Sequence, residues 1–533
     1  MAHAVGTLVQ AGTALHAITA AGGVTNLTLP TGVTLVSTDP LRTALAAKTV
    51  VLVNTPSIPL IVDDGGTVMP LSPAAPTAAP TLTQPNSGSL TGTFGVKYTF
   101  IIRTTGGEII AESEFSPSAS ITITSKKITV SGLETLSGIT FPVADRYEII
   151  RRVYRTSNGT STYFIWYDVE DNTTTTFEDE ATDASLAAFA ADVMGTPPAL
   201  SHIAFFRERL FGVDPDERDR VLHAEAGRPW AWPADNLFET PLYVGDEGHG
   251  VTALVPRRDA LGVAKANCFL QLTGTDDVNF RMVTLSTSIG VASQESVVVY
   301  REAAYFLSTD GVYRWDDGGI KCISDGAVRN WFATDDYFDR TRFDEAFAYV
   351  DPERQTYRLF LIPIDDEDEA CNTWVEFDLQ NQTWWGPHTT NAYVFTAAFQ
   401  LGGEPPTMAL GSDTGEVIVE TADREDAGGE SITIDARTAP MHIGEPPVTA
   451  YWGELVTEVN PQDAGYLEVI PTVGEIDAAA SPALVHDLME ATQRIGRLGV
   501  GRFVQLQFTH DTWNEILELS GFEINPTHTV GRR

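Results

Sequence analysis

A recurring unit of two short apolar strands joined by a tight turn limits the possible folds of this chain more than any other feature. Each turn contains aspartate and usually glycine, which suit hairpins because aspartate bonds its own backbone and glycine tolerates left-handed geometry. The unit occurs at residues 203–223, 303–315 and 408–419, and similar strand pairs are indicated at residues 343–362 and 373–385. One such hairpin is unable to bury its own apolar face, whereas a series of them is typical of β-propeller blades. We therefore predict propeller blades over residues 200–430.

Alternation of apolar and polar residues marks a second β region at residues 81–183. Apolar side chains occupy every second position from Val96 to Ile102, which predicts a strand with one buried face. Similar runs follow at residues 119–124, 127–130, 146–154 and 162–169. Several short strands within roughly a hundred residues are typical of a β-sandwich that resembles fibronectin type III.

Four further regions complete the predicted organisation. Residues 1–69 hold short apolar runs and are predicted to form N-terminal strands or an arm, followed by a proline-rich linker at residues 70–80. Alanine-rich residues 184–199 are predicted to be a linker or a short helix. Residues 431–533 contain further strand patterns and form a C-terminal β unit that completes the propeller or docks on it. The predicted fold class is mainly β: a β-propeller with an N-terminal-side fibronectin type III-like β-sandwich and a C-terminal β unit.

The charge balance restricts the partners of this chain. It has 34 basic and 72 acidic residues among 533, and a net charge of −38. A protein that grips nucleic acid neutralises phosphates with basic side chains, so tight nucleic-acid binding is not expected. Two interpretations of the acidity stay open. It lines a channel along which DNA slides without sticking, or it keeps the chain soluble in a salty environment.

Cysteine usage and hydropathy exclude several classes of protein. Cys268, Cys322 and Cys371 are sparse and lack CxxC spacing, so neither a disulfide framework nor a zinc site is indicated. Assembly in a reducing cytoplasm fits this pattern. The N-terminus lacks the features of a signal peptide. No apolar run approaches about 18 residues, so no membrane span is expected.

Sequence signatures of catalysis are missing from the chain. It contains no GxSxG, Walker, HExxH or Cys/His nucleophile pattern. With 72 acidic residues, any pair of carboxylates can be nominated for glycoside cleavage, so such a nomination carries no information. The segment STDGVYRW at residues 308–315 is similar to the Asp-box hairpin of sialidase propellers, which stabilises a turn. We therefore expect no catalytic residue, no cofactor and no metal.

Two charged groups are candidates for a channel lining or a subunit interface. Arg207 and Arg209 fall on one predicted strand and would share a face, where they would pair with acidic groups or touch passing phosphates. The second group is an acidic run that offers oxygen ligands to Ca²⁺ or forms a solvated hairpin tip. Its members are Asp365, Asp366, Glu367, Asp368 and Glu369.

The order of several short motifs gives a family resemblance. They are FFRERLFGV (205–213), RVLHAE (220–225), VTALVP (251–256), FLQLTG (269–274), GVASQES (290–296), YFLSTDGVYRW (305–315), YVDPER (349–354) and YRLFL (357–361). In this order the motifs resemble the tail nozzle, or tail stabilisation (hub), proteins of short-tailed bacteriophages. The segment IGRLGVGRFVQL at residues 495–506 is similar to the C-terminal part of such proteins.

The resemblance implies a non-enzymatic structural virion protein of the phage tail, assembled in the host cytoplasm. It implies a propeller subunit that forms a homohexameric ring below the portal and adaptor complex and lines the channel for genome ejection. Tail fibres or spikes would be further partners, and double-stranded DNA would pass transiently without specific binding. The predicted sandwich departs from the simplest members of the family and would face outward as an appended module.

Two other classes of function stay open at this stage. One is a carbohydrate-binding or glycan-cleaving surface propeller, which predicts a cleft with aromatic side chains and a perturbed pair of acids. The other is a tail fibre or adhesin that carries the sandwich, for which a more repetitive sequence is expected.

Overall fold

The computed structural model is built almost entirely of β-strands. It describes residues 2–3, 6–46, 49–54, 58–139, 146–186, 195–241, 249–276, 278–326, 328–364, 371–390, 393–402, 407–419, 434–438, 440–443, 449–462, 464–475, 478–511, 519–525 and 528–529. Strands make up 53% and helices 4% of the chain, which confirms the mainly β fold class. The short helices are three 3₁₀ turns at Asp183–Ser185, Gln294–Ser296 and Arg340–Glu345, and α1 at Arg329–Ala333.

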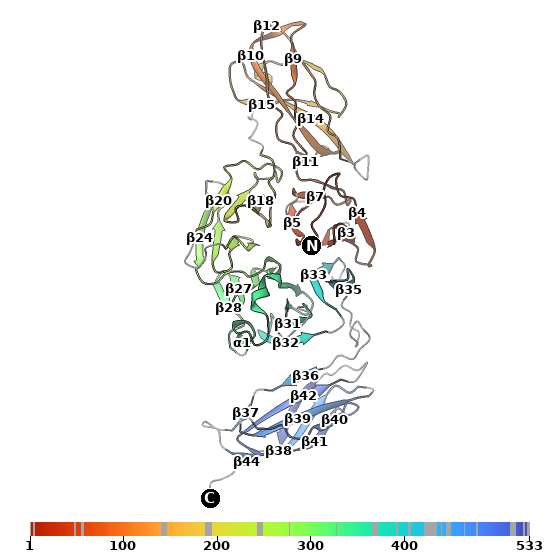
Figure 1. The fold of residues 1–533 in the computed structure, drawn as a ribbon, viewed down its shortest axis with the longest axis vertical. Helices are drawn as coiled ribbons and strands as arrows, with labels where there is room; N and C mark the ends of the chain where they lie inside the picture. Colours follow the sequence, from red (N-terminus) through yellow and green to blue (C-terminus); the bar gives the residue numbers. More distant parts are fainter. Residues whose placement is uncertain are drawn as a thin grey trace. The chain divides into compact units, whose positions relative to one another are not determined.

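Seven antiparallel sheets of the described residues form the blades of a propeller (Figure 1). Blade one is β1 (Ala2–His3), β2 (Gly6–Ala11), β3 (Ala14–Ile18) and β4 (Val24–Leu27); blade two is β5 (Arg42–Ala46), β6 (Thr49–Val53), β7 (Leu60–Val62) and β8 (Val68–Pro70). Blade three is β17 (Ile203–Phe206), β18 (Arg209–Val213), β19 (Arg220–His223) and β20 (Leu237–Glu239); blade four is β21 (Ala253–Pro256), β22 (Leu261–Ala264), β23 (Phe269–Thr273) and β24 (Arg281–Ser286).

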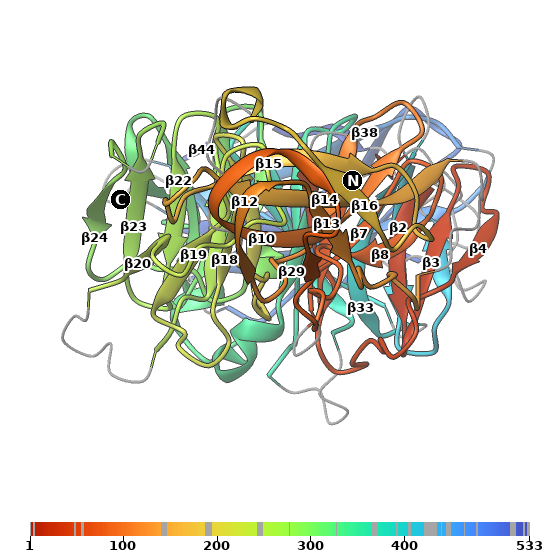
Figure 2. The same ribbon diagram turned by 90° about the horizontal axis from the view of Figure 1, so that it is seen from above.

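The remaining blades follow the same order. Blade five is β25 (Val298–Tyr300), β26 (Ala303–Ser308), β27 (Gly311–Asp316) and β28 (Gly319–Cys322); blade six is β29 (Phe347–Asp351), β30 (Thr356–Leu361), β31 (Thr373–Asp378) and β32 (Thr383–Thr389); blade seven is β33 (Phe395–Leu401), β34 (Thr407–Ser412) and β35 (Val417–Val419). In the view of Figure 2, β2, β3 and β4 of blade one lie beside one another, as do β18, β19 and β20 of blade three.

Each blade buries apolar side chains against both of its neighbours. Seven hydrophobic clusters, one between each pair of adjacent blades, carry this packing. Representative pairs, from the first interface to the closing one, are Leu15 with Leu52, Val53 with Leu210, Phe211 with Leu270, Phe269 with Phe306, Leu307 with Leu359, Phe360 with Phe395, and Leu401 with Ile18. Consecutive residues such as Phe306 and Leu307 therefore serve opposite interfaces, because side chains alternate across a strand.

The ring closes between the first and last blades. Ile18 of blade one packs with Leu401 and Ala409 of blade seven. The Thr7 hydroxyl donates a hydrogen bond of 2.5 Å to the Gln400 carbonyl across the same boundary. Residues 2–70 thus supply two complete blades, and the propeller extends beyond the predicted range of 200–430. Their strands are short, and the sequence did not distinguish them from an arm because partners such as Leu210 for Val53 and Leu401 for Ile18 are far away along the chain.

In blades two to seven the first strand lies nearest the centre of the ring, and in blade one β2 contacts β33 of blade seven. β17 contacts β5 on one side and β21 on the other, and β29 contacts β25 and β33 in the same way. Because every blade repeats the same antiparallel order, the turns that follow these first strands gather at one end of the propeller.

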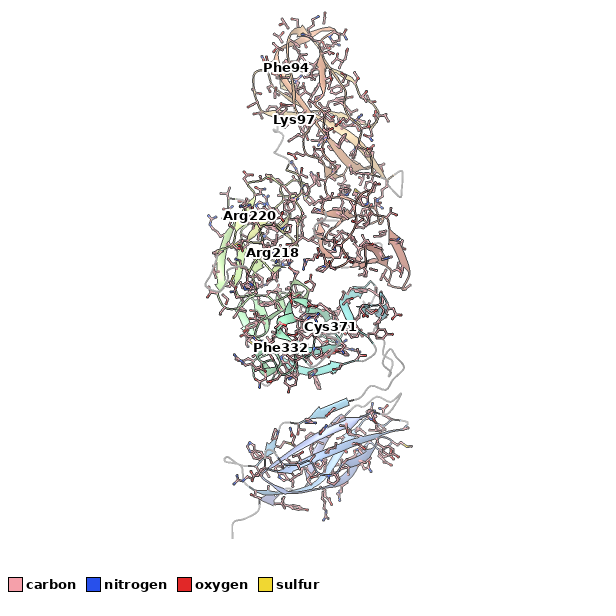
Figure 3. All side chains as sticks on the ribbon, viewed as in Figure 1. Phe94, Lys97, Arg218, Arg220, Phe332 and Cys371 are labelled. Atoms are coloured by element: carbon pink, nitrogen blue, oxygen red, sulfur yellow. The ribbon has the colours of Figure 1, made fainter. Side chains whose placement is uncertain are left out.

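The predicted β-sandwich is inserted between blades two and three. One sheet contains β10 (Ser87–Thr104), β11 (Ile109–Glu112), β12 (Ala119–Lys126), β14 (Tyr147–Thr156) and β15 (Tyr163–Val169); the other contains β9 (Thr81–Thr83), β13 (Ile128–Ser131) and β16 (Phe177–Asp179). Phe94 and Val130 come from different sheets and share one core. Lys97 lies on the other face of β10, 3.3 Å from the centroid of the Phe115 ring (Figure 3).

The base of the sandwich is continuous with the propeller core. Ile102 and Tyr147 of the sandwich pack in the same cluster as Met69 of blade two and Leu210 of blade three. The Tyr147 hydroxyl donates to the buried Asp63 carboxylate of blade two. The extended segment predicted as a proline-rich linker at residues 70–80 is packed as well, since Leu71 is fully buried.

The structure of the predicted linker or short helix at residues 184–199 is not α-helical in two described places. Asp183–Ser185 forms a single 3₁₀ turn, and Gly195 packs so closely on the Trp232 backbone that a Cβ there would lie 1.7 Å from the Trp232 carbonyl oxygen. The predicted helical residues 187–194 lie outside the described part of the chain.

The C-terminal unit is a second β-sandwich, compact in itself. Its sheets are β36 (Ile434–Arg437), β37 (Met441–His442), β39 (Tyr466–Gly474), β40 (Leu484–Asp487) and β42 (Phe503–His510), and β38 (Ala450–Val459), β41 (Thr492–Gly501), β43 (Leu519–Asn525) and β44 (His528–Thr529). Both sheets contribute to one core that includes Trp452 and Leu506. No described strand of this unit joins the seven propeller sheets, which close without it.

Leu401→Ala is expected to weaken the closing interface of the ring. The side chain is 2% exposed, so its truncation should lower the free energy of unfolding by about 2–4 kcal/mol. Chemical denaturation checks the size of the loss. Val417→Ala removes a half-exposed side chain from the same blade and should leave stability nearly unchanged; equal effects of the two substitutions would contradict the assignment of the closure.

Glu112→Gln is expected to change how stability depends on pH. Burial raises the pKa of Glu112, against hydrogen bonds from Tyr154 and Thr99. A raised pKa favours the protonated form, so the contribution of this group to stability is complete below the ordinary pKa of glutamate and is lost as pH rises through the folded value. The variant should therefore gain stability relative to the wild type as pH rises toward neutrality. Thermal unfolding between pH 4 and 7 measures the difference. Glu458→Gln, at an exposed position of the C-terminal unit, is the control and should show a smaller one.

Candidate functional site

The two arginines predicted to share a strand face are separated by a hairpin turn. Arg207 and Glu208 are the two turn residues between β17 and β18, while Arg209 pairs with Phe206 as the first residue of β18. Arg207 lies 3.5 Å from Asp259 of the next blade. Arg209 is 5% exposed and donates to the Ala224 carbonyl at 3.1 Å. The prediction of a common strand face is therefore wrong, because the turn directs the two side chains to different surroundings.

The acidic run at residues 365–369 lies outside the described residues. It falls in the connection between β30 and β31 of blade six. Among the residues that the structure does describe, no group of three or more His, Cys, Asp and Glu side chains is placed to hold a metal ion.

Contacts between neighbouring inner turns link blades three to six at one end of the ring. Arg207 of blade three approaches Asp259 of blade four, and Arg258 of blade four lies 3.8 Å from Glu302 of blade five. In the next step, the guanidinium of Arg301 lies 3.4 Å from the Gln355 amide oxygen of blade six. We call these inner turns the rim. Each step joins an arginine to an oxygen of the following blade.

The rim turns hold unusual backbone conformations. Arg207 and Glu208 have φ values of 49° and 60°, and Arg301 and Gln355 both have φ of 55°. A two-residue hairpin with both φ values positive normally uses Asn-Gly or Asp-Gly. Side chains other than glycine cost of order 1–3 kcal/mol in this region, and such strain is concentrated at functional sites.

A polar cleft opens beside the rim, between blades five and six. Its volume is about 1030 Å³. The lining residues come from the rim and from the outer turns of the two blades: Tyr300, Arg301, Glu302, Ala303, Tyr305, Arg314, Asp316, Asp317, Gly318, Gln355, Leu379 and Gln380. Aromatic, cationic, anionic and amide groups are thus gathered in one hollow.

The carboxylates of this cleft are engaged in structural contacts. Asp316 accepts a hydrogen bond of 2.8 Å from the Gly318 backbone N–H. It also forms an ion pair with Arg314 at 2.9 Å. Asp317 and Glu302 are largely exposed and face Arg257 and Arg258 of blade four. A general acid of a glycosidase needs a desolvated, apolar setting, which neither exposed group has.

Aspartates in other turns of the propeller also accept hydrogen bonds within their turns. Asp351 accepts from the backbone of Glu353 and Arg354, and Asp378 from that of Gln380 and Asn381. In the segment similar to an Asp-box, the Asp310 carboxylate accepts a hydrogen bond of 3.0 Å from the Tyr313 hydroxyl. These aspartates stabilise hairpin ends, as the sequence pattern predicts.

All three cysteines are free thiols. Cys371, which belongs to the propeller (Figure 3), is buried, and burial raises the pKa of its thiol to about 12. Because the thiolate is the reactive form, this side chain stays inert at neutral pH.

No helix in the described part of the chain is long and apolar enough to cross a membrane.

Comparisons with known proteins add little to this description. No family model and no curated protein matches the sequence. Among solved structures, BBS1N in complex with ARL6DN is 9% identical, with a TM-score of 0.27 over 55% of this chain and 83% of that one. YCF48 bound to D1 peptide is 10% identical, with a TM-score of 0.24 over 58% and 91%. An exo-beta-1,3-galactanase from Phanerochaete chrysosporium is 11% identical, with a TM-score of 0.20 over 82% and 98%. Scores this low carry no argument, so the propeller rests on its own sheets.

Sequence reasoning missed most of the cleft. None of the residues that line the cleft was predicted as a site residue. A usable signal was present, because Arg-Glu or Glu-Arg pairs follow the first strand of several repeat units, as at Arg207-Glu208, Arg301-Glu302 and Glu353-Arg354.

Glu208→Gly tests whether the first rim turn is strained. Glycine adopts φ of about 60° without cost, so the variant should gain about 1 kcal/mol in the free energy of unfolding. Thr309→Gly is the matched control in the β26–β27 turn, where no positive φ occurs, and should lose about 0.5–1 kcal/mol. Denaturant titrations of both variants give the comparison; a loss in both would show that no strain is relieved at residue 208.

Proposed function

We propose that this chain is a non-enzymatic structural subunit of the tail of a short-tailed phage, and that it forms the nozzle ring that surrounds the channel for genome ejection. The observation that carries the proposal is the core shared by the inserted sandwich and two propeller blades. The family resemblance implies a propeller with an appended sandwich. The shared core holds that sandwich in a fixed orientation, and a subunit of a ring needs such rigidity.

A shared core fixes the orientation of the sandwich on the propeller. Met69, Leu71 and Tyr147 are each no more than 5% exposed and pack in one cluster. Arg146 adds an ion pair with Asp64 of blade two. A module that only binds a surface can be attached by a flexible tether. A module that is part of a channel wall must keep its position against neighbouring subunits, and the packed junction favours this second role.

The charge distribution supports passage of DNA rather than attachment to it. Of the two arginines first considered for phosphate contact, Arg209 is buried and Arg207 faces Asp259. The chain as a whole has a net charge of −38, which repels polyanions at long range. A channel built from such subunits would let the genome move without arrest.

Negative-stain electron microscopy and native mass spectrometry of the purified full chain test the proposal. We expect closed rings with a central hole and a mass near six times that of one chain. Duplex DNA should show no retention at physiological salt. A monodisperse monomer, a chain that cleaves glycans, or DNA binding with a steep salt dependence would each overturn the assignment.

A further inference from the structure

One arginine that lines the cleft between blades five and six has no carboxylate partner among the described residues. Two arginines, Arg301 and Arg314, and three carboxylates, Glu302, Asp316 and Asp317, line the cleft. Arg314 pairs with Asp316, and Arg257 and Arg258 of blade four pair with Asp317 and Glu302. Because these pairs compensate the three carboxylates, Arg301 is the lining cation that an anionic group of a ligand would meet.

Arg301 keeps hydrogen-bonding capacity for a ligand. Its guanidinium lies 5.1 Å from the centroid of the Tyr300 ring and 3.4 Å from the Gln355 amide oxygen. No carboxylate of the described residues forms an ion pair with it. Stacking on a ring holds the planar fork in place, and a held fork suits two-point recognition of a carboxylate.

Arg314 is the second cation that lines the cleft. It pairs with Asp316 at 2.9 Å, and its buried Nε has no hydrogen-bond partner in the described part of the chain. Tyr305 lies close to both cations. Burial raises the pKa of its hydroxyl, and the charge of Arg314 opposes that rise. The hydroxyl therefore stays protonated at neutral pH and is able to donate.

The other polar groups of the cleft select the rest of the ligand. Gln355 and Gln380 offer amide donors and acceptors from blade six, and Glu302 and Asp317 offer acceptors at the mouth. These carboxylates accept hydrogen bonds from hydroxyl groups. The set therefore fits a ligand that joins a carboxylate, for Arg301, to several hydroxyls.

We propose that the cleft between blades five and six binds an acidic saccharide of the uronic acid type, with its carboxylate on Arg301 and Arg314 and its hydroxyls on the glutamines and the mouth carboxylates. The cleft binds this ligand without cleaving it. The inference goes beyond the proposed oligomeric nozzle, since the propeller of one subunit contains every group that the saccharide site uses.

Titration calorimetry of the full chain with tetragalacturonate tests the proposal. Methyl-esterified tetragalacturonate keeps the hydroxyls and removes the charge, and tetraglutamate keeps the charge without the hydroxyls. We expect binding of the acidic saccharide, with at least about tenfold weaker binding of the ester, a difference of about 1.4 kcal/mol. Tetraglutamate should bind more weakly than the acidic saccharide.

Two variants locate the site. Arg301→Gln and, from the other blade, Gln380→Ala should each weaken binding, the former by about tenfold. Arg494→Gln removes a 69% exposed guanidinium from the C-terminal unit and should leave binding unchanged. The proposal is overturned by absence of binding at millimolar ligand, by equal affinity for the ester or the peptide, or by equal effects of Arg301→Gln and Arg494→Gln. Each outcome is independent of whether the chain assembles into rings.

Discussion

Burial of both faces of every blade is the constraint on which the rest of the structure depends. A four-stranded sheet leaves two apolar surfaces, and in this chain each surface is covered by a neighbouring blade, with the base of the sandwich added between blades two and three. Neighbouring residues on one strand, such as Leu210 and Phe211, therefore serve different interfaces. Removal of one blade would expose two clusters at once. The positions of the rim, the cleft and the inserted sandwich all follow from this closed packing.

The same constraint explains which parts of the fold could be predicted from sequence. Hairpins and their turns are local, so the strands around Ser308 and Gly311 and the strand through Val96 to Ile102 were predicted correctly. The prediction of a single buried face was wrong, because Thr99 and Ile101 are fully buried as well. The two N-terminal blades were missed as blades because Val9 of blade one packs with Leu401, almost 400 residues away, and the inserted sandwich separates blade two from blade three in the sequence. A local sequence pattern does not indicate which distant strands will pack together.

The candidate site shows the same division. Arg207 was recognised from its sequence, but its place in a turn with φ of 49° was not, since Arg-Glu is a rare choice for a two-residue hairpin. The cleft combines side chains of two blades, and Arg301 and Gln380 meet only after the ring has formed. Turn aspartates were predicted from the sequence to accept from the nearby backbone, as Asp378 does. Contacts between blades, such as that of Asp259 with Arg207, required coordinates.

Ring closure also governs when this protein is able to fold. The hydrogen bond from Thr7 to Gln400 spans 393 residues, so the first blade waits for the last one throughout synthesis. Contacts of such long range are slow to form. Until blades three and seven have been made, the faces of blades two and one that pack on them expose apolar strands to other chains. The inserted sandwich has its own core and can fold early, before the later blades emerge. Nascent chains of this protein therefore pass through a long aggregation-prone stage, which makes yield sensitive to expression rate and chaperone supply.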